Sequence, residues 1–572
     1  MAESFSLTLI LSERNPAHLE EQADRVSDPS DAFYGHYWDR TQLATAVALP
    51  TAERCAVAEW LADQGMRVQP LESAGQVLLA EATAAQVEKV FGRSTRAWLQ
   101  QKEEGQGQRL RLALPRRLAG YLQKVEGILG KGRYVTLGEV TEVRPGCATA
   151  DPLVPKPMDL AGMTPADIAD LYHFPATWDG QGETIALMML GGELVARDLH
   201  SFWRAHDISP PEVKLVRVGP TVRRPVPPLY QREAAMTVAW AGAMAPGATI
   251  VVYCVDPLLV ADPWAAFLLA VIQDQCHCPT VACTSWMVAE RRYYAQHGHS
   301  VIMGLLSQAA LLGITVIAAA GNWGALDGIP RTRSQGYLVS GAPWPRGIFP
   351  AVETRVLAVG GTMIRQRHPL VELGWSGPPP PDTPELRPFD RLAGSGGFSD
   401  HVPIPAWQKP VLQDNYPRGR EAPSVAPYGR GFPDVALMAA GRAMQQGPGE
   451  SFTLQGYQAV VGGQWIDYAG GTSVAAPIWA AILARANQAR RSRGQPRLGF
   501  VNPLLYQLHR AQLAPLRPIT SGAADVSITV MNAQRCPVPY EMPGYLCQPG
   551  WNPVTGLGVP HVTNLLQLLC TM

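Results

Sequence analysis

The chain has 572 residues, 47% of them apolar, and its 48 Lys and Arg residues balance its 48 Asp and Glu residues. A chain of this length can bury at least two substantial cores, so we expect a multi-domain globular protein. The balanced charge leaves no overall field for nucleic acid or an anionic membrane, and no apolar run approaches the roughly 18 residues of a spanning helix. We therefore expect neither kind of partner.

The N-terminal residues do not have the pattern of a secretory signal. In "MAESFSLTLILSERNP" two acidic residues stand near a short apolar run that alternates with Ser and Thr, whereas a signal peptide is basic and then continuously apolar. We predict a strand here, and either a cytoplasmic location or export by a route without a cleavable signal.

The first hundred residues alternate between strand and helix patterns. "SFSLTLIL" (4–11) alternates as a strand does, a helix through Val57 and Leu61 stops near Gly65, and "GQVLLAEA" (75–82) is apolar enough for an inner strand. Thr83 and Gln86 then form a capping box for a further helix. These patterns predict a small α+β domain over residues 1–140.

Residues 141–160, "TEVRPGCATADPLVPKPMDL", contain four prolines and no periodicity, so we expect a linker. A second domain, residues 161–572, opens with "MTPADIADLYHF". In that stretch Thr164 is an N-cap, Pro165 takes the first helical position and Asp167 lies in the first turn.

Five near-continuous apolar runs follow, which are typical of a parallel sheet covered by helices on both faces. They are "TIALMML" (184–190), "TIVVYCV" (249–255), "TVACTSW" (280–286), "ITVIAAAGN" (314–322) and "RVLAVGG" (355–361). The class predicted for this domain is therefore α/β. Residues 374–450 are rich in Gly and Pro, and we expect them to be mostly loop.

One short stretch has the character of a catalytic nucleophile. In "AGGTSVAAPIWAAI" (469–482), two glycines precede Thr472 and Ser473, and an amphipathic run begins directly afterwards. A serine there places its developing negative charge near the positive end of a helix. The alternative is that Thr472 and Ser473 only cap that helix.

The wider stretch "GGTSVAAPIWAAILARANQ" resembles the serine motif of the sedolisins, the serine-carboxyl peptidases whose core is similar to subtilisin. Further stretches resemble the family in its own order, among them "EAAMTVAWAGAMAPGATIVVY", "GITVIAAAGNWGALDG", "GSGGFSDHVPIPAWQ" and "GWNPVTGLGVP". Residues 4–98 resemble its activation domain. The resemblance implies a subtilisin-like parallel sheet flanked by helices, preceded by a small α+β, ferredoxin-like activation domain and a linker that active members cut.

The resemblance also implies a serine activated by a glutamate, an aspartate four residues later that holds the glutamate, and a second aspartate that stabilises the oxyanion. Ser473 and Glu233 match, but Thr237 stands at the first aspartate position and Asn322 at the second. An amide can donate a hydrogen bond to an oxyanion at any pH. Thr237 can donate one to Glu233 but cannot supply a charge or share a proton.

Two alternatives to these assignments stay open. Glu233 could be a solvated surface residue, although the motif favours a carboxyl group that faces the site. His297 or His299, in "QHGHS", could replace Glu233 as the base in the subtilisin manner, but "TIALMML" lacks the aspartate that such a histidine requires.

The family's calcium site maps onto Pro518, Ile519, Gly550 and Asn552, where neither family carboxylate is kept. Calcium prefers several charged oxygens, so we expect the site to be lost, although Asp525 could substitute. We expect no cofactor.

Cys536 and Cys547 are the one pair of cysteines that we consider bridged by a disulfide. The segment Cys276, His277 and Cys278 could suggest a metal, but three adjacent residues rarely reach one ion.

Two functions follow from these residues. The first is an atypical serine peptidase or acyl-transfer hydrolase that acts on peptide or protein substrates, with Ser473, Glu233, Thr237 and Asn322 at its site and an optimum closer to neutral than the family implies. The second is an inactive pseudo-peptidase that binds a partner protein. In either case Trp286 and Met287 are predicted to border the substrate pocket.

Overall fold

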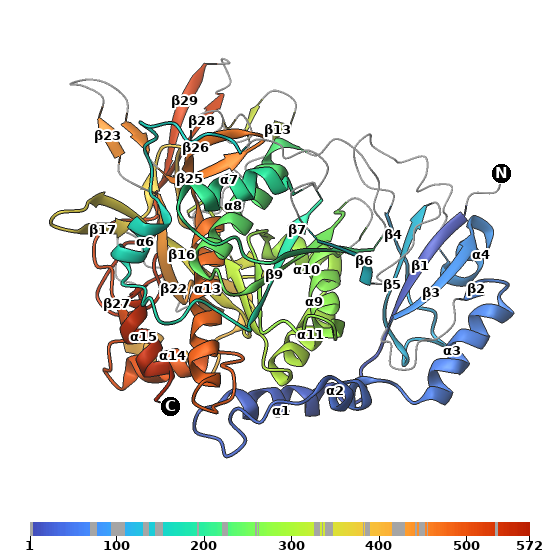
Figure 1. Ribbon diagram of the computed structural model, residues 1–572. Coiled ribbons are helices and arrows are strands. Elements are labelled where there is room, and N and C mark those ends of the chain that lie inside the picture. Colours follow the sequence, from blue (N-terminus) through green and yellow to red (C-terminus); the bar gives the residue numbers. More distant parts are fainter. Residues whose placement is uncertain are drawn as a thin grey trace.

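The computed structural model describes most of the chain. It covers residues 4–68, 77–92, 109–129, 137–142, 153–191, 194–219, 227–257, 260, 262–324, 326, 332–333, 336–337, 347–380, 383, 389–414, 429–440, 443–445, 452–454, 456–531 and 536–571. Figure 1 shows a small N-terminal sheet to the right of a larger body that contains a central sheet and its helices.

The N-terminal sheet has five antiparallel strands in the order β2-β3-β1-β5-β4. Its elements are β1 (Ser4–Leu11), α3 (Thr51–Asp63), β2 (Arg67–Val68), β3 (Val77–Thr83), α4 (Ala84–Phe91), β4 (Arg109–Arg111) and β5 (Leu122–Leu129). The alternation of β1 buries Phe5, Leu7 and Leu9 in one core with residues of α3 and α4. The predicted Thr83–Gln86 capping box is also confirmed.

Two helices between β1 and α3 were not predicted. They are α1 (Pro16–Ser27) and α2 (Arg40–Val47), and both run along the lower edge of the large body (Figure 1). Leu19 and Leu43 join the core of that body. Helix α1 packs against α11 (Ser300–Leu311), which lies far along the chain. The sequence of residues 16–47 alone therefore does not indicate that these two helices are buried against the large body.

The large sheet confirms the predicted parallel α/β core. Its order is β17-β16-β12-β10-β7-β9-β8-β6, with β22 also paired to β16. The strands are β6 (Leu137–Glu142), β7 (Thr184–Leu190), β8 (Val213–Val218), β9 (Thr249–Val255), β10 (Val281–Thr284), β12 (Thr315–Ala319), β16 (Leu357–Gln366), β17 (Val371–Gly374) and β22 (Val435–Ala440). Pairings are parallel except at β16–β17 and β6–β8.

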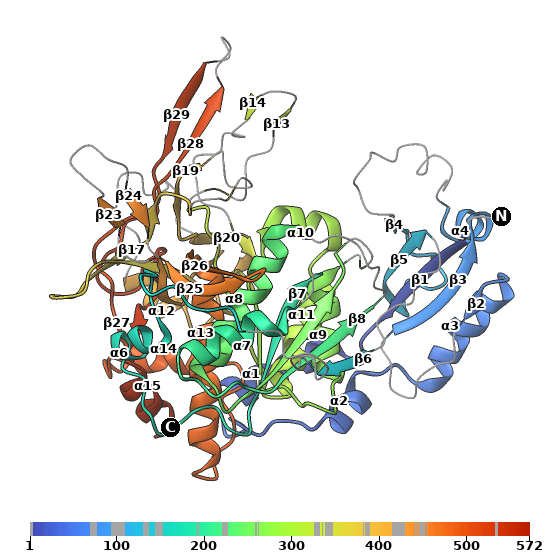
Figure 2. The same ribbon diagram turned by 45° about the horizontal axis from the view of Figure 1, so that its top comes forward.

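Side chains of β7 alternate between the two faces of this sheet. Leu187 packs in the cluster that contains α8 (Pro228–Met244) and α13 (Thr472–Arg491). Met188 packs in the cluster that contains α9 (Pro263–Gln273) and α11. Helices α8 and α13 therefore cover one face, while α9 and α11 cover the other and are covered in turn by α1 and α2 (Figure 2).

Further elements surround this core. The remaining helices are α6 (Pro165–Leu171), α7 (Ala196–Ala205), α10 (Glu290–His297), α12 (Lys409–Asp414), α14 (Asn502–Arg510) and α15 (Val562–Leu569). The smaller strands include β11 (Val288–Ala289), β15 (Ile348–Phe349), β19 (Phe389–Ala393), β20 (Gly397–Pro403), β21 (Gly429–Phe432), β25 (Tyr457–Val461), β26 (Gln464–Ala469), β28 (Val526–Met531) and β29 (Pro537–Met542). In α6, Thr164 and Asp167 form the predicted cap.

Strand β6 crosses the boundary that we predict at residue 140. It pairs antiparallel with β8 at the edge of the large sheet, with Thr141 opposite Leu215. Of the predicted linker 141–160, residues 143–152 lie outside the described residues. Further along, Val154 is held by hydrogen bonds to Ser201 and Trp465. The division into 1–140, 141–160 and 161–572 stays a prediction.

Residues 374–450 contain more strand than the expectation of mostly loop allowed. Strands β19, β20, β21 and β22 all fall within this range, and β22 enters the large sheet. These strands are hard to recognise in the sequence because they are short, carry little periodic signal and lie among many Gly and Pro residues.

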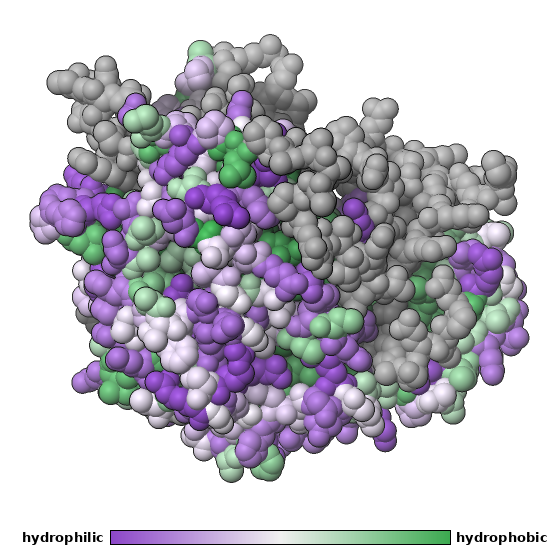
Figure 3. Space-filling view, in the orientation of Figure 1, coloured by the Kyte–Doolittle hydropathy of each residue, from purple (hydrophilic) through white to green (hydrophobic). Residues whose placement is uncertain are grey.

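On the face in Figure 3, hydrophilic and hydrophobic residues are interspersed. Among the described helices, none is long and apolar enough to cross a membrane.

Candidate active site

Ser473 lies in the first turn of α13, as the sequence predicts. The turn is reached through Gly471, whose φ of +84° is a conformation that glycine adopts without strain. A Cβ on Gly471 would lie 2.8 Å from Nδ2 of Asn322, so this approach also leaves no room for a side chain. Ser473 is 4% exposed. Its backbone N–H belongs to the first turn, where amides have no partner within the helix.

Glu233 faces Ser473 from α8, which packs beside α13. Its side chain is only 8% exposed, which excludes the solvated-surface alternative. Burial raises the pKa of Glu233 to about 7, while a hydrogen bond with the Ser473 side chain and the charge of Arg232 act in the opposite direction. A carboxyl group with this pKa can accept and return a proton near neutral pH.

Thr237 lies one turn further along the same face of α8 and is 5% exposed. Its hydroxyl makes no hydrogen bond to any residue that the structure describes, and neither does Oε1 of Glu233. The hydrogen bond that we expected Thr237 to donate to Glu233 is therefore not formed. The two unpaired oxygens leave Glu233 held by packing and by its contact with Ser473.

Asn322 follows β12 and has its amide oriented by Thr472. Oδ1 of Asn322 accepts hydrogen bonds from the Thr472 backbone N–H and from the Thr472 hydroxyl, each at 2.9 Å. Because a backbone N–H can only donate, the oxygen of the amide must face Thr472. Nδ2 is therefore the end of the amide that is left to donate to a reacting group beside Ser473.

Two further contacts hold this region together, and sequence reasoning did not identify either. The Gly321 backbone N–H donates to Oγ1 of Thr472 at 3.1 Å. Ser285, which directly follows β10, donates its hydroxyl to the carbonyl of Ser473 at 2.9 Å. Ser285 occurs in the quoted "TVACTSW" run, but no motif spacing links it to Ser473. The ends of β10 and β12 are thus joined to the start of α13.

Comparison with known proteins identifies the families that the chain resembles. The family model for the pro-kumamolisin activation domain matches residues 2–129, and the model for the subtilase family matches residues 234–499. Kumamolisin from a Bacillus species is 33% identical over 416 residues, which cover 71% of this chain and 63% of kumamolisin. Tripeptidyl-peptidase 1 from Bos taurus is 27% identical, with 99% of this chain and 92% of the relative covered.

The chain is similar to a sedolisin proform, with a pro-kumamolisin activation domain followed by a subtilase-family domain. A solved structure of Pseudomonas sedolisin, a serine-carboxyl proteinase complexed with pseudo-iodotyrostatin, has a TM-score of 0.55 and 20% identity, and covers 72% of this chain and 99% of that chain. At this identity the likeness concerns the fold, which is the predicted subtilisin-like sheet. The chain also spans less than two thirds of the length of kumamolisin.

The position of the sedolisin calcium site is organised here around Asn552, which is fully buried. Its Nδ2 donates to the carbonyls of Ile519 and Gln548, each at 3.2 Å. Its Oδ1 accepts from the backbone N–H groups of Val554 and Thr555, each at 3.0 Å. The amide thus makes contacts to carbonyl oxygens that a cation would otherwise make.

The remaining residues of that site do not fit calcium. Pro518 has no ligating side chain and Gly550 has none at all. The Asp525 carboxylate accepts from the Gly544 backbone N–H at 2.8 Å, so it is engaged elsewhere in the loop. In the described part of the chain, no group of three or more His, Cys, Asp or Glu residues could hold a metal. Hard cations need charged oxygens, which this set lacks.

The predicted disulfide between Cys536 and Cys547 is wrong. Cys547 is a buried free thiol, and a Cβ on Gly374 would lie 2.6 Å from its sulfur. Cys536 lies exposed beside β29. Packing against β17 therefore holds the position of Cys547, and a bridge plays no part.

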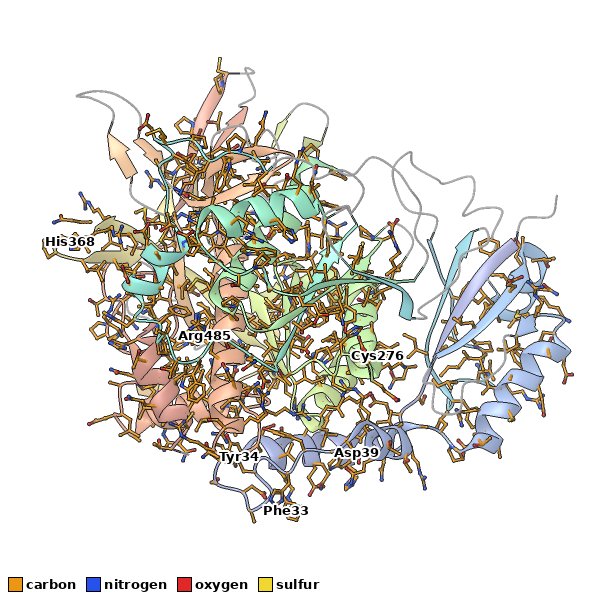
Figure 4. The ribbon with its side chains drawn as sticks, viewed as in Figure 1. Phe33, Tyr34, Asp39, Cys276, His368 and Arg485 are labelled. Atoms are coloured by element: carbon orange, nitrogen blue, oxygen red, sulfur yellow. The ribbon has the colours of Figure 1, made fainter. Side chains whose placement is uncertain are left out.

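The histidines named as alternatives form other pairs. Nδ1 of His297 lies 3.6 Å from Asp262, and Nε2 of His299 lies 3.1 Å from Glu353. His277 likewise pairs with Asp274 at 2.7 Å. Its neighbour Cys276 lies on the side of the body near α9 (Figure 4). The Ser473 side chain is paired with Glu233, so the contacts favour glutamate as its base.

Proposed function

We propose that this sedolisin-like protein is a serine peptidase, or an acyl-transfer hydrolase on a related substrate, that works near neutral pH. Ser473 is the nucleophile, Glu233 the base and Asn322 the oxyanion donor. The observation that carries this proposal is the buried carboxyl group of Glu233, which interacts with the Ser473 side chain from the neighbouring helix and whose pKa burial raises to about 7. Perturbed carboxyl groups of this kind gather at catalytic sites.

The reaction can be written with these residues alone. Glu233 takes the proton of the Ser473 hydroxyl as Oγ bonds to the substrate carbonyl carbon, and the carbonyl electron pair moves to its oxygen. Nδ2 of Asn322 and the Ser473 backbone N–H stabilise that oxyanion. The C–N bond then breaks as its nitrogen takes the proton from Glu233. Water attacks the acyl ester, Glu233 takes its proton, and Ser473 leaves as the reprotonated hydroxyl.

Thr237 supplies neither charge nor hydrogen bond to this sequence of steps, so the rate should be reduced relative to a full triad. Loss of the charged third member in serine triads costs on the order of 10⁴ in rate without abolishing catalysis. The proposed substrates are peptides or proteins. They would include the segment 141–160 of the chain itself.

A pseudo-peptidase that binds a partner protein is the second candidate. The unpaired oxygens of Glu233 and Thr237 favour it, because a site that is not used for chemistry can tolerate unsatisfied polar atoms. The paired Ser473 and Glu233 and the oriented amide of Asn322 favour chemistry. The two candidates differ in whether Ser473 reacts.

The test is covalent labelling of the full chain with a small fluorophosphonate, followed by intact-mass measurement across acidic to mildly alkaline pH. We expect labelling of the wild type at neutral pH and none of Ser473→Ala or Glu233→Gln. A wild type that stays unlabelled and uncut at every pH, while its thermal unfolding shows it to be folded, contradicts the peptidase proposal and leaves the binding protein.

A further inference from the structure

The segment after β10 places three side chains beside the proposed nucleophile. Ser285 bonds the carbonyl of Ser473, and Trp286 packs edge-on against Tyr230 with ring centroids 4.8 Å apart. Tyr230 lies one turn before Glu233 on α8. Trp286 therefore lies on the Glu233 side of Ser473. The next residue, Met287, lies on the other side.

Met287 reaches the loop that carries the oxyanion donor. A Cβ on Gly321 would lie 3.3 Å from Sδ of Met287 and 2.7 Å from Oγ of Ser395. Gly321 directly precedes Asn322 and donates its N–H to Thr472. The thioether of Met287 thus fills the space between the backbone of residues 285–287 and the Gly321–Asn322 turn. Met287 is half-buried and packs against the hydrophobic clusters on both faces of the sheet, which places it at the sheet end.

An acyl group bound for attack would enter this same space. Its carbonyl carbon must approach Oγ of Ser473 while its oxygen approaches Nδ2 of Asn322. The side chain of the attacked substrate residue is carried by the Cα next to this carbonyl carbon. It must therefore extend between the two segments that flank Ser473 on the Asn322 side. Those segments are 285–287 and 321–322, and the side chain that already occupies the gap is that of Met287.

We propose that Met287 is a specificity-determining residue that closes the pocket for the acyl residue of the substrate, so that glycine or alanine is preferred at the position before the scissile bond. This inference rests on the proposed function. Its physical basis is steric, because a side chain as large as phenylalanine has to displace the thioether from contact with Gly321 and Ser395. The backbone here is held on both sides, since Ser285 bonds Ser473 and β11 pairs with β15.

The experiment compares two tripeptide p-nitroanilides that differ only in the last residue, alanine or phenylalanine, on the full-length wild type, Met287→Ala and Met287→Leu. We expect kcat/KM of the wild type to favour alanine by at least about tenfold, in the range that pocket contacts supply. Met287→Ala should raise kcat/KM for the phenylalanine substrate by about tenfold. Met287→Leu, which conserves volume, should keep the wild-type ratio.

Labelling with the small fluorophosphonate, run in parallel, separates the two ways to fail. If Ser473 is labelled but the wild type hydrolyses both substrates equally, or if Met287→Ala leaves their ratio unchanged, Met287 does not set specificity and the proposed function stands. If Ser473 is neither labelled nor active in any of the three proteins, the proposed function is wrong and this inference with it. Thermal unfolding of each variant checks that it is folded.

Discussion

In the proposed mechanism, Glu233 determines the pH at which Ser473 reacts. Its ordinary pKa is 4.5 and burial raises it to about 7, so the group is largely protonated in mild acid and cannot accept a proton there. We expect the rate of Ser473 labelling to rise about tenfold per pH unit below 7 and to level off above it. A rate that is highest in acid and falls towards neutral pH would exclude Glu233 as the base.

The raised pKa of Glu233 also affects the stability of the fold. Stability is favoured in acid, whereas the reaction rate is expected to rise with pH. A folded state that binds the proton of Glu233 more tightly than the unfolded chain is favoured in acid, and this contribution is lost as pH rises from about 4.5 through about 7. The proposed catalysis therefore requires the charged form of Glu233, which the fold favours less. Comparison of the wild type with Glu233→Gln by chemical denaturation across this range isolates the contribution of Glu233.

A substitution of Thr237 tests whether its hydroxyl contributes to stability or to the reaction. Its buried hydroxyl has no partner among the described residues, and leaving such a group unsatisfied costs free energy. We expect Thr237→Val, which has the same shape, to raise the free energy of unfolding by about 1 kcal/mol and to leave the pH profile of labelling unchanged. Thr237→Val that loses activity would mean that the hydroxyl contacts Glu233 during the reaction.

At the scale of an element, the loops between β27 (Leu516–Arg517) and β30 (Val559–Pro560) depend on one amide. Asn552→Ala removes contacts to Ile519, Gln548, Val554 and Thr555, so we expect the free energy of unfolding to fall by about 3 kcal/mol. Calcium should not shift the unfolding midpoint of the wild type, and a chelator should not lower it. A clear rise in Tm with calcium would contradict the replacement of the ion by Asn552.

Elements with a strong local signal were predictable. The apolar runs over β7 and β9, and the caps at Thr83 and Thr164, depend on residues a few positions apart. Helices α1 and α2 were missed because their apolar residues are buried in the core of the large body, where α1 packs against α11 far along the chain, and no local pattern encodes such a contact. The strands of residues 374–450 were missed because they are short and interrupted by glycine and proline.

The candidate site was predictable only as far as motif resemblance reaches. Ser473, Glu233, Thr237 and Asn322 come from matched positions, whereas the direction of each side chain comes from packing. The unpaired hydroxyl of Thr237 and the place of Met287 beside Gly321 depend on segments that meet only in the folded chain. The same holds for Cys547, which we expected to be bridged to Cys536 and which packs against β17 instead.

At the scale of the whole molecule, the activation domain is held on the body through α1, α2 and the turn between them. Tyr37 donates its hydroxyl to the Leu498 carbonyl at 2.8 Å, and the Trp38 N–H donates to Leu311 at 2.8 Å. Gly313, with φ +67°, leaves room for the Tyr37 ring, since a Cβ there would lie 2.6 Å from it. Figure 4 shows Tyr34 and Asp39 along this lower edge.

We expect Gly313→Ala to weaken this contact and to speed hydrogen exchange of the amides in α1. The positive φ alone costs about 1 kcal/mol for alanine, and the collision with Tyr37 adds to it. Gly462→Ala is the matched control, because Gly462 has φ +60° with no atom within 4 Å of its Cβ position. Equal exchange in α1 for both variants would show that the Tyr37 contact does not hold the domain.

The pairing of β6 with β8 also affects what a cut in the linker would achieve. A break anywhere between residues 143 and 152 separates the covalent chain, yet Leu137–Glu142 stays hydrogen-bonded to Val218–Lys214 at the edge of the large sheet. The N-terminal fragment would then remain as a non-covalent subunit, anchored by a strand as well as by α1 and α2. Processing of the linker and release of the N-terminal fragment would therefore be separate events, because release would require that a strand be withdrawn from a sheet.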